Sequence, residues 1–223
     1  HLSIRRQRQM CIRDRYTMNL ELLKELKSEG LWLRRINIRQ VEGEGFQEIP
    51  ENEFRKFKTT VREEIDRPML EEIFPLGTKL KDLWWESRGS RIRLPEHLSE
   101  GRYRDPSKHG EPGITFGRQI GAYPILVGVP YAIPLESGSD IVVTGHGMRS
   151  ISGIEYGLDI NHATKSQLQA LPGIGDKSSW KIISNRARRA NKNQGSFASV
   201  EEAFSEAGVT MPPLAPEVFV TTH

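Results

Sequence analysis

One short string constrains the fold of this 223-residue chain more than any other feature: Leu-Pro-Gly-Ile-Gly at residues 171–175. A proline and two glycines within five positions interrupt any helix. In front of the string, Thr164 and Gln167 have the spacing of a capping box, which starts a helix. A second helix is expected from Asp176, and its buried stripe is expected to consist of Trp180, Ile183 and Ala187. The string therefore predicts two helices joined by a tight turn.

The turn has the chemistry of a phosphate site. Gly173 and Gly175 permit a positive φ and a close approach of the backbone to a ligand, and Ile174 between them can point inward as a plug. Backbone N–H groups at the start of the following helix attract anions. Lys177 and Lys181 lie one helical turn apart and are candidates to flank a bound phosphate. Because phosphate contacts read no base, we expect binding without sequence preference.

The net charge says little about such binding. Lys and Arg number 32 against 29 Asp and Glu, a formal net charge of +3. Residues 1–15 hold five arginines and one aspartate, and without them the balance is 27 basic against 28 acidic residues, or −1. A basic patch must therefore be local. Residues 161–194 supply one, with seven Lys or Arg and a single acid, Asp176.

Residues 159–188 resemble the helix-hairpin-helix motif of DNA-binding proteins. The resemblance implies nucleic acid as the partner, with DNA favoured over RNA. A purely structural role is the alternative, because such hairpins also serve as scaffolds and protein contacts. Ser199 and Glu202 predict a further helix. The turn after it, at residues 207–210, lacks a second glycine and is flanked by glutamates, so no phosphate site is expected there.

The middle of the chain predicts a small β-barrel. From residue 75, glycine and proline become frequent and the apolar runs become short. Such runs between glycine-containing turns are typical of small barrels. Five strands are expected, at residues 78–85, 115–120, 125–129, 140–144 and 149–154. Between the first two, residues 87–112 are polar enough and long enough to form a functional loop.

The N-terminal third has helix and strand patterns. Residues 19–29 and 51–66 predict helices, and Pro68 is expected to end the second. Between them, residues 33–41 alternate, with Ile36 and Ile38 on one face, which predicts a strand. A helix that feeds a strand with one polar face is typical of the last piece of an α/β unit.

Residues 1–15 have neither a helical nor a strand period. A basic arm for nucleic acid and an Arg-rich transit peptide are two interpretations. The third, which we favour, is that the string SIRRQRQMCIRDR resembles translated sequencing-adapter read-through. We therefore expect residues 1–15 to be disordered and the chain to be the C-terminal fragment of a longer protein.

The order of several strings resembles a group of enzymes. LRRINIRQV, FRKFKTTVREEID, MLEEIFPLGTKL and TFGRQIGAYPILVG, followed by the hairpin, resemble the mostly archaeal radical SAM superfamily proteins with a C-terminal helix-hairpin-helix motif. The resemblance implies a parent with a partial α/β barrel, a four-iron four-sulfur cluster and S-adenosylmethionine. It also implies a role in nucleic-acid modification or repair, and the alternative is a non-catalytic nucleic-acid-binding or scaffold module. The lone cysteine, Cys11, cannot hold such a cluster, so we expect no cofactor and no activity in this chain alone.

These expectations combine into an α+β, multidomain fragment. It comprises an artefactual or disordered segment (1–15), the end of a radical SAM-type α/β barrel (16–74), a small β-barrel (75–158) and a helix-hairpin-helix domain (159–223). The longest apolar stretch, residues 125–135, is broken by glycine and proline, so no membrane span is expected. One cysteine excludes a disulfide framework and favours the cytoplasm. The histidines lack the spacing of metal ligands, and the sequence indicates no oligomeric state.

Overall fold

The structure is a computed structural model, and it describes residues 2–31, 36, 38, 49–86, 109–119, 125–135 and 137–222. The chain divides into two compact units, His1–Ile73 and Phe74–His223. Each unit is described by itself.

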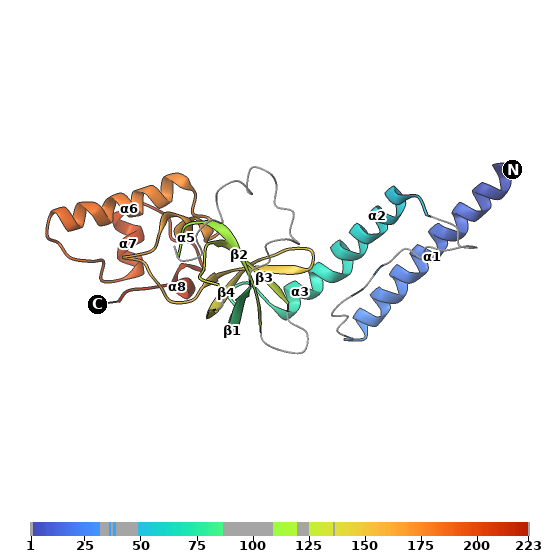
Figure 1. Cartoon of the computed structure of the whole chain (residues 1–223), viewed down its shortest axis with the longest axis horizontal. Coiled ribbons are helices and arrows are strands. Elements are labelled where there is room, and N and C mark those ends of the chain that lie inside the picture. The colour runs from blue at the N-terminus through green and yellow to red at the C-terminus, as the bar shows by residue number, and fades with distance from the viewer. Residues whose placement is uncertain are drawn as a thin grey trace. The chain divides into compact units, whose positions relative to one another are not determined.

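Every regular element that the structure describes in the first unit is helical (Figure 1). Its elements are α1 (Leu2–Ser28), α2 (Glu51–Val61), the π-helical turn η1 (Arg62–Asp66) and α3 (Arg67–Ile73). Tyr16 of α1 stacks on Phe57 of α2, with ring centroids 4.1 Å apart. The segment predicted to be disordered is therefore helical from Leu2 onward.

The prediction that this region ends a radical SAM-type α/β barrel is wrong. Among the described residues of the first unit there is no strand, and a βα unit requires a sheet on which its helices pack. The strand expected at residues 33–41 lies mostly outside the described residues, and Ile36 and Ile38, which are described, belong to no strand. The strand at residues 33–41 was expected only from the alternation of apolar and polar residues there, whereas the barrel was also implied by the family resemblance.

Pro68 does not end the helix as expected. The chain stays helical from α2 through α3, with Pro68 as the second residue of α3. The π-turn comes directly before it, and the Arg67 N–H donates to the Arg62 carbonyl. Proline has no N–H and its ring clashes with the carbonyl four residues earlier. A wider turn relieves that clash without ending the helix.

The second unit contains a closed barrel in which all five predicted strands are present. They are β1 (Lys79–Glu86), β2 (Pro112–Gln119), β3 (Leu126–Tyr131), β4 (Gly138–His146) and β5 (Ser150–Glu155). Their order around the barrel is β1-β2-β3-β5-β4. β3 and β5 are parallel, and the other neighbours are antiparallel.

A bulge in β1 helps the barrel to close. The pairing with β4 shifts between Leu80 and Leu83, and Asp82 there has a φ of 55°. The Asp82 N–H donates to Asp140 Oδ1 at 3.2 Å. A bulge bends its strand and increases the local twist, which suits β1 to pair with both β2 and β4.

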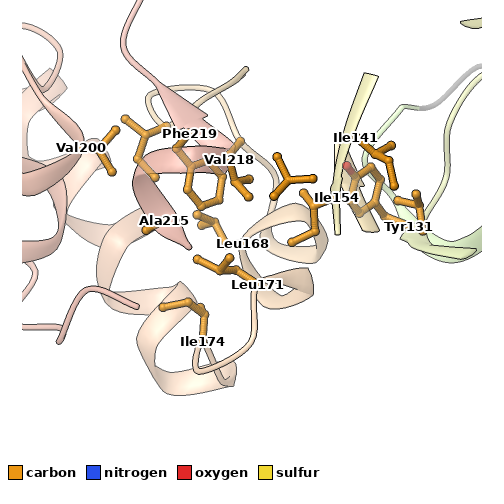
Figure 2. Packing of buried hydrophobic residues seen from close by; sticks show 14 of the residues in the cluster. Tyr131, Ile141, Ile154, Leu168, Leu171, Ile174, Val200, Ala215, Val218 and Phe219 are labelled. Carbon is orange, nitrogen blue, oxygen red and sulfur yellow. The ribbon is translucent and has the colours of Figure 1, made fainter. Parts of the chain in front are cut away.

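The helices that follow the barrel share its core. These helices are α5 (Lys165–Ala170), α6 (Asp176–Asn191), α7 (Val200–Glu206) and α8 (Ala215–Val218). α5 packs against β3, whereas α6 and α7 lie further from the barrel (Figure 1). β6 (Leu158–Asp159) pairs in parallel with β7 (Phe219–Val220). One cluster of buried side chains continues from Ile141 and Ile154 in the barrel to Leu168 and Leu171 beside Phe219 (Figure 2). Helices and barrel therefore form one packed body.

Candidate functional site

The predicted capping box builds the first helix of the hairpin. The Thr164 side chain accepts a hydrogen bond from the Gln167 N–H, and the Gln167 side chain accepts one from the Thr164 N–H at 2.8 Å. Leu168 and Leu171 are fully buried. α5 is thus fixed at its start by the capping box and along its inner face by the core.

The turn between α5 and α6 contains one glycine that the backbone requires. Gly173 has a φ of +96°, a conformation that side chains resist. The next residue, Ile174, donates its N–H to the Leu171 carbonyl at 3.0 Å and is only 5% exposed. Figure 2 shows its side chain in the same cluster as Leu171. Ile174 thus plugs the turn into the core, as predicted.

Gly175 has a different role from the one that its sequence suggests. Its φ of −92° and ψ of −176° are extended backbone that any residue adopts. A Cβ atom there would meet no atom of the described residues within 4 Å. Gly175 is the N-cap residue of α6 and has no side chain with which to cap it. The first N–H groups of α6 are therefore open to an approaching anion.

Most of the seven basic residues near the turn already contact other groups. Lys165 pairs with Asp176 at 2.6 Å, and its hydrogen bond holds the pKa of that carboxyl below its usual value. Arg189 contacts Glu202 at 2.9 Å and Glu206 at 2.5 Å. Two of the three acids of α7, Glu202 and Glu206, therefore already face a guanidinium.

Three other cations of α6 are exposed and have no side-chain partner within the described part of the chain: Lys177, Arg188 and Lys192. Lys181 is also exposed, and its ammonium donates to the Gly208 carbonyl at 3.4 Å. The structure thus leaves both predicted lysines, Lys177 and Lys181, at the surface near the turn.

The buried face of α6 differs from the predicted one. Trp180 is 51% exposed, whereas Ser179, Ile182 and Asn185 are buried. The Ser179 hydroxyl donates to the Asp176 carbonyl at 2.8 Å, which satisfies it inside the protein. The buried positions come one or two residues before the expected ones, and Ile183 is only partly buried against the core. The outward face therefore combines Trp180 with lysines.

A hydrogen-bonded pair of His109 and Glu155, which the sequence did not predict, lies near α5. His109 Nε2 lies 2.5 Å from Glu155 Oε2, and the Glu155 N–H donates to the Tyr131 hydroxyl at 2.9 Å. The hydrogen bond with Glu155 raises the pKa of His109 although burial opposes it. Next to His109, the Gly110 carbonyl accepts the Thr164 hydroxyl at 2.5 Å. His109 and Glu155 are 46 residues apart, so no local sequence pattern predicts their contact.

The described residues fit neither a metal nor a cluster. They contain no group of three or more His, Cys, Asp or Glu placed to hold a metal ion. The chain has one cysteine, whereas an iron–sulfur cluster needs several thiolates.

In the described segments, the helices are too short or too polar to cross a membrane.

Comparison with known proteins finds relatives in two archaea. An uncharacterised protein of Archaeoglobus fulgidus is 35% identical over 171 residues, which are 72% of this chain and 28% of that protein. An uncharacterised protein of Methanocaldococcus jannaschii is 36% identical over 152 residues, 63% of this chain and 24% of that protein. No family model and no solved structure matches the chain. The chain thus spans about a quarter of the length of both archaeal proteins to which it is similar.

Proposed function

We propose that the α5–α6 hairpin binds the phosphate backbone of nucleic acid, preferably DNA, without reading its sequence. The observation that carries the proposal is the open start of α6. Gly175 presents backbone rather than a side chain there, and a substituent at its Cβ position would project into free space. The outward N–H groups favour an anion. Lys177 and Lys181 lie exposed one turn apart beside them.

The surroundings make the hairpin a firm support for such contacts. Leu168 and Leu171 anchor the α5 side of the turn in the core, Ile174 anchors the turn itself, and Ile182 anchors α6. The acid nearest the turn, Asp176, is paired with Lys165 and so adds little repulsion. A phosphate would therefore meet preformed donors and two exposed ammonium groups.

The reaction of the longer protein is a separate proposal. The resemblance to radical SAM enzymes implies an iron–sulfur cluster and S-adenosylmethionine in the parent, which would supply radical chemistry. The residues of this chain do not fit that group, because a single cysteine cannot bind the cluster. The contribution of this chain to the longer protein would be to bind nucleic acid. A scaffold role for the hairpin is the competing hypothesis.

Fluorescence anisotropy with the full chain tests phosphate binding. Labelled DNA strands of unrelated sequence should bind with similar affinity, and the affinity should fall as salt rises. Lys177→Ala should weaken binding to every sequence alike and lower the salt slope by about one. Lys192→Ala is the matched control, since it removes the same charge about 22 Å further along α6 at 1.5 Å per residue. A smaller loss is expected for it.

Gly175→Val is the sharper variant. Its backbone conformation suits valine and its side chain has room, so the fold should be kept. The added methyl groups would stand where the phosphate approaches. Binding should therefore fall further than in Lys177→Ala, at an unchanged melting temperature. If Gly175→Val binds as wild type does, or if salt has no effect, the hairpin is a scaffold.

A further inference from the structure

We propose that Trp180 stacks an unpaired base beside the hairpin, so that this site binds single-stranded nucleic acid more tightly than duplex. The inference rests on the phosphate binding proposed above and names its substrate class. It begins from an exposed aromatic side chain that packing does not explain.

Trp180 lies on the outward face of α6. Its side chain is 51% exposed, whereas Ile182 on the inner face is fully buried. The Lys165 ammonium lies over the indole ring at 4.8 Å from its centroid and is paired with Asp176 at 2.6 Å. A cation held over one face restrains the ring through cation–π attraction. The ring therefore stays beside the hairpin with much of its surface open to a ligand.

The charges around the ring favour a polyanion over an apolar partner. Lys177 precedes Trp180 by three positions and Lys181 follows it directly, and both are exposed. The nearby acid, Asp176, is already paired. An exposed indole flanked in sequence by two exposed lysines matches a nucleotide, which brings one aromatic face and one negative charge. It matches a hydrophobic protein surface poorly, because those lysines would have to lose their water.

The distances suit one nucleotide or two. Trp180 follows Gly175 by five residues, which is about 7.5 Å along the helix axis. A strand with a phosphate at the open start of α6 can thus bring that nucleotide's base, or the next one, onto the ring. Stacking requires a free base face, which a duplex hides between neighbouring pairs. The arrangement therefore predicts preference for single strands and little discrimination among the four bases.

Binding of the full chain to three labelled DNA probes of one length tests the inference: a mixed-sequence single strand, its duplex, and a single strand lacking all bases. Wild type should prefer the first probe. Trp180→Leu should lose about ten-fold in affinity for it, the scale expected for one stacked base, and little for the other two. Trp180→Phe keeps an aromatic face and should retain most of the affinity. Because Trp180 is exposed, both variants should melt as wild type does.

The outcomes separate the two proposals. If wild type binds no probe in a salt-dependent way, phosphate binding itself fails. If the probe without bases binds normally but Trp180→Leu leaves single-strand binding unchanged, or weakens all three probes alike, only the stacking inference is overturned. It is also overturned if light scattering shows that Trp180→Leu dissociates an oligomer, since a second copy of the chain would then cover the ring.

Discussion

At the scale of single residues, the two glycines of the hairpin have separate tasks that their spacing does not distinguish. Gly173 supplies a positive φ, whereas Gly175 supplies open space at the start of α6. A string of letters shows that both lack a side chain, but only coordinates show which one the backbone needs. For the same reason, the sequence wrongly predicted that Trp180 would be buried. Helical spacing alone could not tell that a hydroxyl at Ser179 would be buried and the indole exposed.

Alanine at the two glycines separates these tasks. Gly173→Ala should lower the free energy of unfolding by about 1–2 kcal/mol, the cost of a side chain in left-handed backbone. Gly175→Ala has allowed dihedral angles and free space, so its stability should match wild type. Urea unfolding followed by circular dichroism measures both. Equal losses would contradict the division of roles.

The His109–Glu155 pair should make stability depend on pH. The pKa of His109 is raised in the folded state by its hydrogen bond to Glu155. The charged pair therefore contributes its full stabilisation below the unfolded pKa of about 6.5, and this contribution is lost as pH rises through the raised value. The melting temperature of wild type should therefore fall as pH rises through the raised pKa of His109. In His109→Gln that fall should be smaller. His146→Gln is the control and should not reduce it, because the printed contact of His146 is with the Phe74 backbone carbonyl and not with a carboxylate.

At the scale of elements, the barrel strands were predictable and the N-terminal region was not. Most of the strands contain a short apolar run with glycine or proline nearby, which is the signal that predicted them. Burial alternates along β3, whereas β4 has four consecutive buried residues, so alternation alone does not describe the closed sheet. The alternation at residues 33–41 looks similar but predicted a barrel that the described residues do not form. Pro68 was expected to end its helix, but a π-turn before it lets the helix continue. A π-turn has no sequence signature as clear as a proline, so the sequence did not predict it.

Two strand glycines allow a test of barrel packing. A Cβ on Gly117 would lie 2.5 Å from the ring of Trp85, which is fully buried. Gly117→Ala should therefore destabilise the protein by about 1–3 kcal/mol through overpacking. At Gly145, a Cβ would meet Ser152 at an ordinary 3.7 Å, so Gly145→Ala should cost much less. Comparable denaturation midpoints for the two variants would show that Trp85 can move aside.

At the scale of the whole molecule, the second unit joins barrel and hairpin through one core. Side chains of α5 and α8 belong to the same cluster as the interior of the barrel, and the Thr164 hydroxyl bonds to the Gly110 carbonyl. Sequence reasoning placed a boundary between residues 158 and 159, and it had no means to see shared packing across it. The candidate site therefore depends on the barrel for its rigidity.

Truncation should show this dependence. A chain of residues 74–223 is expected to unfold in one cooperative transition, because it keeps the whole cluster. Residues 159–223 alone should show a broad, weakly cooperative melt, since their apolar faces lose the barrel. Thermal melts by circular dichroism compare the two. A sharp melt for the shorter piece would mean that the hairpin region is an independent domain.

The pairing of β6 with β7 has a consequence for how the protein is made. Leu158 pairs with Phe219, and Ala215, Val218 and Phe219 are buried in the core. The barrel strands lie within residues 79–155, so on a ribosome they can emerge and associate early. The hairpin, although synthesised well before residue 215, cannot complete its packing until that later segment has left the exit tunnel. During translation the α5–α6 region is therefore a candidate binding site for a chaperone before it can hold nucleic acid.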